Sequence, residues 1–99
     1  MKERRVLFSP ESATDLMELY EWISAEASPE VAMSYLERVE EFCGRLSMGS
    51  ERGHRRDDVR PGLRILGFER RLTIAFTVDD ETVTVLRVFT AGKNWETVL

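Results

Sequence analysis

The sequence is poor in the residue types that build metal sites and covalent cross-links. Among its 99 residues it has one cysteine, Cys43, and one histidine, His54. A single cysteine excludes an internal disulfide and a metal site built on cysteines, and a lone histidine offers a metal ion too few nitrogen ligands. The same histidine would have to serve every Ser–His–Asp or Cys–His arrangement. We therefore expect no metal, no cofactor and no nucleophilic triad.

Long apolar runs are also missing. No stretch approaches the ~20 residues that a membrane-spanning helix needs. The charged N-terminus is followed only by the apolar residues 6–8, which are too few for the core of a signal peptide. We therefore expect a cytoplasmic protein with no membrane partner, and the length suits one domain over residues 1–99.

An excess of positive charge is absent. The net charge is −4, so we expect no direct sequence-specific binding to nucleic acid. The charges are unevenly spread, because the charged side chains of residues 1–46 are mainly acidic, whereas arginines gather between residues 52 and 71. Two halves of opposite charge can serve different partners. The gathered arginines are Arg52, Arg55, Arg56, Arg60, Arg64, Arg70 and Arg71.

Two of the three prolines follow a serine, a pattern that is typical of helix starts. Ser9 precedes Pro10, and Ser28 precedes Pro29. Apolar and small residues recur at helical spacing after each pair, which predicts two helices joined as an antiparallel hairpin. In the first helix they are Ala13, Leu16, Met17, Tyr20, Ile23, Ser24 and Ala27, and in the second Val31, Ala32, Tyr35, Leu36, Val39, Phe42, Cys43 and Leu46.

The remaining segments predict strands. Residues 4–8 form a short one, residues 63–68 and 72–78 form two more, and the β-branched run 82–89 forms the last. Residues 47–62 form one long loop, which is long enough to suggest a function. The predicted fold is α+β, with the order β-α-α-β-β-β and the helical hairpin packed on a mainly antiparallel four-stranded sheet.

Three features have more than one interpretation at this point. Trp22 falls on the acidic side of the first helix, where it either packs on the helical hairpin or belongs to a partner-binding surface. The arginines of residues 52–62 either pair with Asp57 and Asp58, or contact phosphates, or bind a protein. Arg87 lies in mid-strand, where it either shares the face of Val83, Val85 and Phe89 and needs a buried partner, or opens onto the groove beside the basic loop.

A resemblance to a known family rests on three segments taken together. They are Arg56–Arg64 (RDDVRPGLR), the predicted hairpin Leu72–Phe89 and the tail Gly92–Glu96 (GKNWE). With the order of the elements, they resemble the RelE/ParE toxin superfamily, and its ParE branch in particular, over nearly the whole chain. The resemblance implies a small toxin encoded with a ParD-type antitoxin, which neutralises it by laying an extended or helical segment along an apolar groove.

The resemblance implies DNA gyrase as the target of a ParE-type toxin, whereas RelE-type relatives cut mRNA in the ribosome with arginines and a tyrosine or histidine. Cleavage by a 2′-hydroxyl needs groups that move protons as well as cations for the phosphate. Thr73 and Asn94 stand where the RelE arginines would be, and no tyrosine or histidine follows Gly92. The sequence therefore favours the branch without nuclease chemistry, with no catalytic residues.

We accordingly predict a toxin that inhibits gyrase by protein binding. A ribosome-dependent mRNA endoribonuclease is the alternative, and a protein that only binds its antitoxin is a third. The residues predicted to contact the target are Lys93, Asn94, Trp95, Glu96, Arg64 and Arg87. Those predicted to contact the antitoxin are Leu19, Trp22, Arg60 and Arg71. The acidic helix face suggests that the antitoxin contributes some basic side chains.

Overall fold

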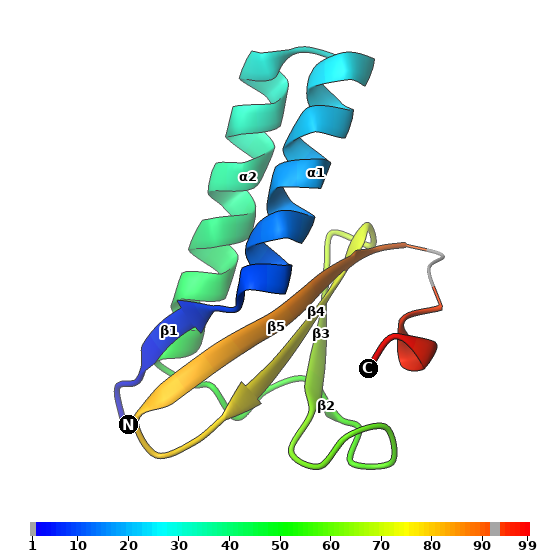
Figure 1. Ribbon diagram of the computed structural model, residues 1–99. Coiled ribbons are helices and arrows are strands. Elements are labelled where there is room, and N and C mark those ends of the chain that lie inside the picture. Colours follow the sequence, from blue (N-terminus) through cyan, green and yellow to red (C-terminus); the bar gives the residue numbers. More distant parts are fainter. Residues whose placement is uncertain (1, 92–93) are drawn as a thin grey trace.

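Each serine–proline pair begins a helix, as the sequence predicts. In the computed structural model, which describes residues 2–91 and 94–99, helix α1 spans Pro10–Glu26 and helix α2 spans Pro29–Gly44. The side chains of Ser9 and Ser28 each accept a hydrogen bond from the backbone N–H three residues further on. These caps satisfy N–H groups that the helices leave unpaired, and the two helices form an antiparallel hairpin (Figure 1).

Five strands form one sheet in the order β1-β5-β4-β3-β2. Strand β1 is parallel to β5, and all other neighbours are antiparallel. This confirms the predicted α+β fold, and the two-residue strand β2, inside the predicted loop, extends the expected four strands to five. The strands are β1 (Arg5–Phe8), β2 (His54–Arg55), β3 (Arg64–Phe68), β4 (Leu72–Val78) and β5 (Thr82–Thr90), and the short 3₁₀ helices are η1 (Arg45–Ser47) and η2 (Trp95–Thr97).

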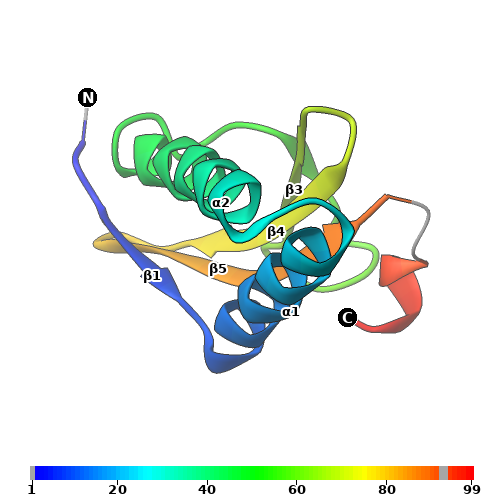
Figure 2. The same cartoon turned by 90° about the horizontal axis from the view of Figure 1, so that it is seen from above.

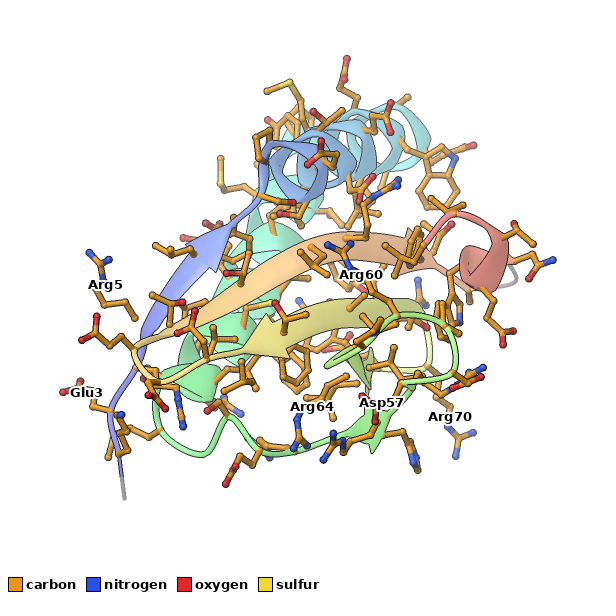
Figure 3. The ribbon with its side chains drawn as sticks, turned by 60° about the horizontal axis from the view of Figure 1, so that its bottom comes forward. Glu3, Arg5, Asp57, Arg60, Arg64 and Arg70 are labelled. Carbon is orange, nitrogen blue, oxygen red and sulfur yellow. The ribbon has the colours of Figure 1, made fainter. Side chains whose placement is uncertain are left out.

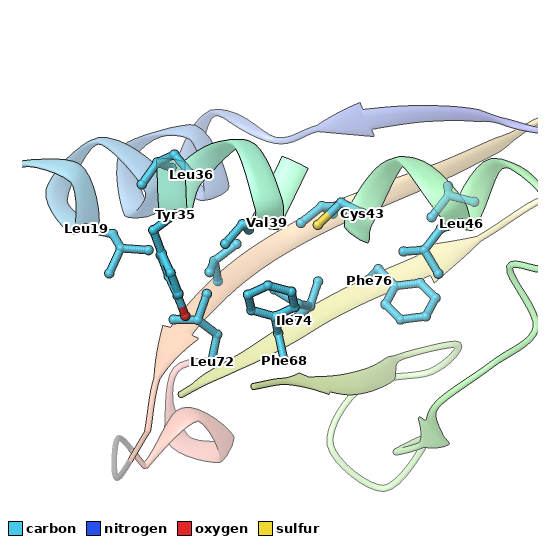
Figure 4. Packing of buried hydrophobic residues seen from close by; sticks show 13 residues of the cluster. Leu19, Tyr35, Leu36, Val39, Cys43, Leu46, Phe68, Leu72, Ile74 and Phe76 are labelled. Atoms are coloured by element: carbon cyan, nitrogen blue, oxygen red, sulfur yellow. The ribbon is translucent and has the colours of Figure 1, made fainter. Parts of the chain in front are cut away.

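Each face of the sheet carries an apolar cluster. Both helices cover one face, which we call the first face, and we call the opposite side the second face (Figure 2). The main core lies on the first face, and its largest fully buried members are Phe76, Leu46, Ile74 and Val39 (Figure 4). A smaller cluster of Leu63, Ala75 and Phe89 lies on the second face, and it is covered by Val59, Trp95 and Leu99 among others.

Strand β5 contains a bulge that changes its facing pattern. Phe76 pairs with Val85 and Ala75 pairs with Arg87, so Leu86 is an extra residue. A bulge of this kind interrupts the alternation of side chains along a strand. As a result Val85 and Val88 both face the main core although they are three residues apart.

Helix α1 is rotated relative to its apolar pattern. Ala13 and Met17 belong to the predicted apolar face, yet both are exposed, and Met17 keeps 66% of its surface. That part of the prediction is wrong, because polar contacts with the open edge of β5 set the rotation of the helix. The Ser9 hydroxyl donates a hydrogen bond to the Leu86 carbonyl at 2.7 Å. The buried side is centred on Ser12 and Leu19 instead.

Candidate functional site

An open groove lies where the helical hairpin extends past the end of the sheet. Its volume is about 700 Å³. Helix α1 and the start of α2 form one side, and the β3–β4 turn with the end of β5 forms the other (Figure 1). The residues that line the groove are Leu19, Trp22, Ile23, Glu26, Ala27, Val31, Tyr35, Arg70, Arg71, Leu72, Thr90 and Ala91.

Three of the four residues predicted to contact an antitoxin meet in this groove. Leu19 is nearly buried in its wall, Trp22 stands on the rim with 60% of its surface exposed, and Arg71 comes from the opposite side. Leu19 and Trp22 are neighbours because residues three apart lie on one side of a helix. The fourth, Arg60, lies on the loop between β2 and β3 and does not line the groove (Figure 3).

The groove has walls of opposite charge. Glu26 lies on the α1 side, whereas Arg70 and Arg71 lie on the sheet side. Tyr35 from α2 also lines it, and its ring stands between Leu19 and Leu72 (Figure 4). Burial raises the pKa of the Tyr35 hydroxyl, and the nearby charge of Glu69 raises it further, so this group stays protonated at neutral pH.

The arginine loop and the C-terminal segment are joined on the second face through Arg56. Its guanidinium forms ion pairs with Asp58, at 2.9 Å, and with Glu96, and it lies over the ring of Trp95 at 5.1 Å. Trp95 in turn stacks on Phe89, with ring centroids 6.4 Å apart. We call the group Arg56, Asp58, Trp95 and Glu96 the clasp.

The loop that the clasp holds is itself organised by short-range ion pairs. Asp57 pairs with Arg55 at 3.2 Å and accepts a hydrogen bond from the Gly62 N–H at 2.8 Å. The hydrogen bond from the Gly62 N–H lowers the pKa of the Asp57 carboxyl most, and the hydrogen bond from Arg55 lowers it as well. Arg55 and Arg56 thus form the predicted pairs with the two aspartates, whereas Arg52 and Arg60 have no ion pair among the described residues.

The residues predicted to contact a target fall into separate places. Asn94, Trp95 and Glu96 lie on the second face, and Lys93 lies outside the described residues. Arg64 pairs in register with Phe76, a core residue of the first face, so it projects from the opposite side of the sheet to Trp95. The structure therefore brings the described tail residues together and keeps Arg64 apart from them.

Arg87 binds the first helix. Its guanidinium donates two hydrogen bonds to the carboxylate of Asp15, at 2.7 and 3.0 Å, and the Val88 N–H donates a third at 2.9 Å. Asp15 thus serves as an acceptor on the open edge of β5, beyond the point where β1 stops pairing with it. The hydrogen bonds with this carboxylate raise the pKa of the Arg87 guanidinium. Arg87 pairs in register with Ala75 and lies over the ring of Phe89 at 4.8 Å, so it belongs to the second face, and its partly buried partner is Asp15.

Few groups that move protons lie on the second face. The rings of Tyr20 and Tyr35 belong to the first-face core, and Cys43 is buried there with its pKa raised to about 11, mainly by burial. His54 is exposed on β2, opposite Ile65. Within residues 2–91 and 94–99, no three histidine, cysteine or acidic side chains come together as metal ligands, and no helix is long and apolar enough to cross a membrane.

Two solved structures share this fold. One is the chromosomal ParDE toxin–antitoxin system from P. aeruginosa, at 24% identity and a TM-score of 0.78, with 89% of this chain and 96% of that chain covered. The other is the toxin–antitoxin complex RelBE2 from Mycobacterium tuberculosis, at 23% identity and a TM-score of 0.62, with 94% and 97% covered. A search among curated proteins found no match.

A fold of two helices over a mixed sheet is thus one that toxin–antitoxin proteins adopt. At these sequence identities the two structures show the fold alone. The family follows from the sequence, because the model described as the ParE toxin of the type II toxin–antitoxin system parDE matches residues 6–95. This chain belongs to that ParE toxin family.

Sequence reasoning missed two side chains that organise the site. No local pattern points to Asp15, because its partner Arg87 lies 72 residues away in the sequence. Arg56 was one of several loop arginines, and its contact with Glu96 spans 40 residues. The one local signal was the spacing of Arg55-Arg56-Asp57-Asp58, in which each arginine pairs with the acid two residues later.

Proposed function

We propose that this ParE-type toxin inhibits DNA gyrase by binding to it, and that a ParD-type antitoxin neutralises it by occupying the groove. Membership of the ParE family supports the role of a toxin in a type II system. The apolar groove, with Leu19 in its wall and Trp22 on its rim, supports the site of the antitoxin. Aromatic side chains in such positions often dominate the energy of an interface.

The observation that carries the choice of target surface is the clasp. The aromatic stack on Phe89 and the ion pairs of Arg56 hold Trp95 and Glu96 in one arrangement, so binding through them would cost little ordering entropy. Asn94 and Val98 are exposed beside Trp95. We therefore propose residues 93–96 as the main gyrase contact. Arg87 lies over the ring of Phe89, on which Trp95 stacks, and we propose it as a secondary contact.

A ribosome-dependent mRNA endoribonuclease is the second candidate, and one observation favours it. His54 lies opposite Ile65 in an antiparallel pair, so the imidazole projects on the second face, where Ile65 packs. A histidine on this face could transfer a proton. Thr73 also stands in this sheet, paired with Phe89, but a threonine supplies no positive charge for a phosphate.

The first experiment follows DNA and protein synthesis by pulse labelling, minutes after this chain is induced in bacteria without its antitoxin. DNA synthesis that fails first supports gyrase inhibition. Protein synthesis that fails first, with discrete cuts in mRNA that disappear in His54→Ala, supports the nuclease. If full expression inhibits neither, then the chain only binds its antitoxin and the proposal is wrong.

Two tryptophan variants separate the two proposed surfaces. Trp95→Ala should lose growth inhibition and still bind the antitoxin, because it opens the clasp and leaves the groove intact. Trp22→Ala should inhibit growth and resist neutralisation, because it removes the exposed ring at the rim of the groove. Thermal melting checks that both variants fold. If the two variants behave alike in both assays, then the division into two surfaces is wrong.

A further inference from the structure

The turn between β3 and β4 has an unusual backbone for its sequence. Glu69 and Arg70 have φ of 51° and 58°, in the left-handed region that glycine and asparagine favour. The Arg71 N–H donates to the Phe68 carbonyl at 2.9 Å and closes the turn. Residues with side chains in this conformation are strained, and such strain persists where the surrounding structure fixes it.

The surroundings do fix this turn. Glu69 forms two hydrogen bonds with the guanidinium of Arg38 on α2, at 3.1 and 3.2 Å, which tie the turn to the helical hairpin. Arg38 also lies over the ring of Tyr35, at 5.0 Å from its centroid. The strained turn therefore places Arg70 and Arg71 at the groove, beside the tyrosine.

The charges at this end of the groove are not balanced. The carboxylate of Glu69 is taken up by Arg38, whereas neither Arg70 nor Arg71 has an ion pair among the described residues. Both arginines are exposed and line the groove. Two guanidinium groups with free donors favour a negatively charged oxygen in whatever occupies the groove.

The Tyr35 hydroxyl supplies an independent observation. Only 8% of Tyr35 is exposed, and its buried hydroxyl has no hydrogen-bond partner within the described part of the chain. A buried hydroxyl without a partner is costly, so such a group calls for an explanation. Because Tyr35 lines the groove together with Arg70 and Arg71, a carboxylate held by these arginines is the acceptor that we expect for its hydroxyl.

We propose that Arg70, Arg71 and the Tyr35 hydroxyl form a carboxylate-binding site at the sheet end of the groove, which receives an acidic residue of the antitoxin segment. The two arginines neutralise the carboxylate, and the hydroxyl donates to one of its oxygens. Glu26 on the opposite wall favours a basic residue of the same segment. The segment therefore lies with its acidic side toward the sheet and its basic side toward α1. This inference rests on the proposed role of the groove.

The test measures the affinity of this chain for the antitoxin encoded beside it. Tyr35→Phe should weaken binding about 10-fold or more, since a hydrogen bond to a charged group is lost. Arg71→Gln should weaken it by a similar factor. Tyr20→Phe and Arg5→Gln are the matched controls, because neither residue lines the groove, and both should bind as wild type.

Double-mutant cycles identify the partner of the site. Each Asp and Glu of the antitoxin segment is changed to its amide in turn, and a peptide amidated at its C-terminus tests the terminal carboxylate. For one acidic residue of the antitoxin, the amide substitution should no longer weaken binding when the toxin carries Arg71→Gln or Tyr35→Phe. Additive losses for every acid, or wild-type affinity of Tyr35→Phe, would overturn the site. If wild type does not bind the antitoxin at all, then the proposed function fails as well.

Thermal melting distinguishes a binding role from a structural one. Tyr35→Phe should melt at or above the wild-type temperature, because it removes a hydroxyl that has no partner in the free toxin. Arg70→Gly should also melt higher, since glycine adopts the left-handed conformation without strain, yet bind the antitoxin more weakly. Weaker binding that only accompanies a lower melting temperature would overturn the proposal.

Discussion

Replacing Asp15 with alanine removes the carboxylate that joins α1 to β5. Three hydrogen bonds are lost at once, two from Arg87 and one from the Val88 N–H. The pair is partly shielded from water, since only 10% of the Asp15 side chain and 21% of the Arg87 side chain are exposed. The substitution therefore leaves a guanidinium and a backbone N–H without their acceptor.

The size of the effect follows from these contacts. Removing one partner of a buried ion pair costs about 3–5 kcal/mol, and a hydrogen bond to a charged group contributes about 1.5–3 kcal/mol. Because water can reach part of Arg87, we expect the lower end, about 3 kcal/mol of unfolding free energy. In a domain of this size that lowers Tm by roughly 12–24 °C.

Chemical denaturation and thermal melting of purified variants measure this loss. Glu18→Ala is the matched control, because Glu18 is exposed one turn further along α1, and its effect should stay within about 0.5 kcal/mol. A cycle with Arg87→Ala should give a coupling of about 1.5 kcal/mol or more. If Asp15→Ala and Glu18→Ala unfold alike, then the ion pair does not hold α1 on the sheet and our account of its rotation fails.

Three further predictions concern the stability and reactivity of the free toxin. Burial raises the pKa of the Cys43 thiol to about 11, so iodoacetamide at pH 8 should label it only after unfolding, and rapid labelling of the native protein would contradict its place in the core. Gly53→Ala should lower the free energy of unfolding by about 2 kcal/mol or more, since φ is +79° and a Cβ would lie 2.2 Å from the Ile65 carbonyl oxygen. Gly44→Ala is the control, because a Cβ there meets nothing within 4 Å, and it should leave the melting temperature nearly unchanged. Hydrogen bonds lower the pKa of Asp57 and Asp79 in the folded state, first from the backbone N–H groups of Gly62 and Glu81 respectively. Their stabilisation is therefore present above the unfolded carboxyl pKa of about 3.9 and lost as pH falls below it, so Tm should drop below about pH 4, less steeply in Asp79→Asn.

The elements themselves could be predicted because their signals are local. The Ser9-Pro10 and Ser28-Pro29 pairs mark helix starts without reference to the rest of the chain, and the β4 strand was predicted at its observed limits, Leu72–Val78. The tight hairpins place the strands next to one another, and the β-α-α-β-β-β order follows.

The remaining features depend on contacts between distant residues. The rotation of α1 is set by the Asp15–Arg87 pair, and it cannot be read from helical periodicity, which favoured a face containing Met17. The bulge at Leu86 decides which side Arg87 faces, and no turn residue marks it. The clasp likewise joins Arg56 to Glu96 across 40 residues, so the sequence indicated the residue types but not their pairing.

The measurement that tests the central claim most directly is DNA supercoiling by purified gyrase in the presence of the purified toxin. We expect wild type to inhibit supercoiling, the cognate antitoxin to reverse the inhibition, and Trp95→Ala to lose it while Trp22→Ala keeps it. Full supercoiling at a large excess of folded, antitoxin-binding toxin would contradict the account. The chain would then be a ParE-family toxin whose target is not gyrase.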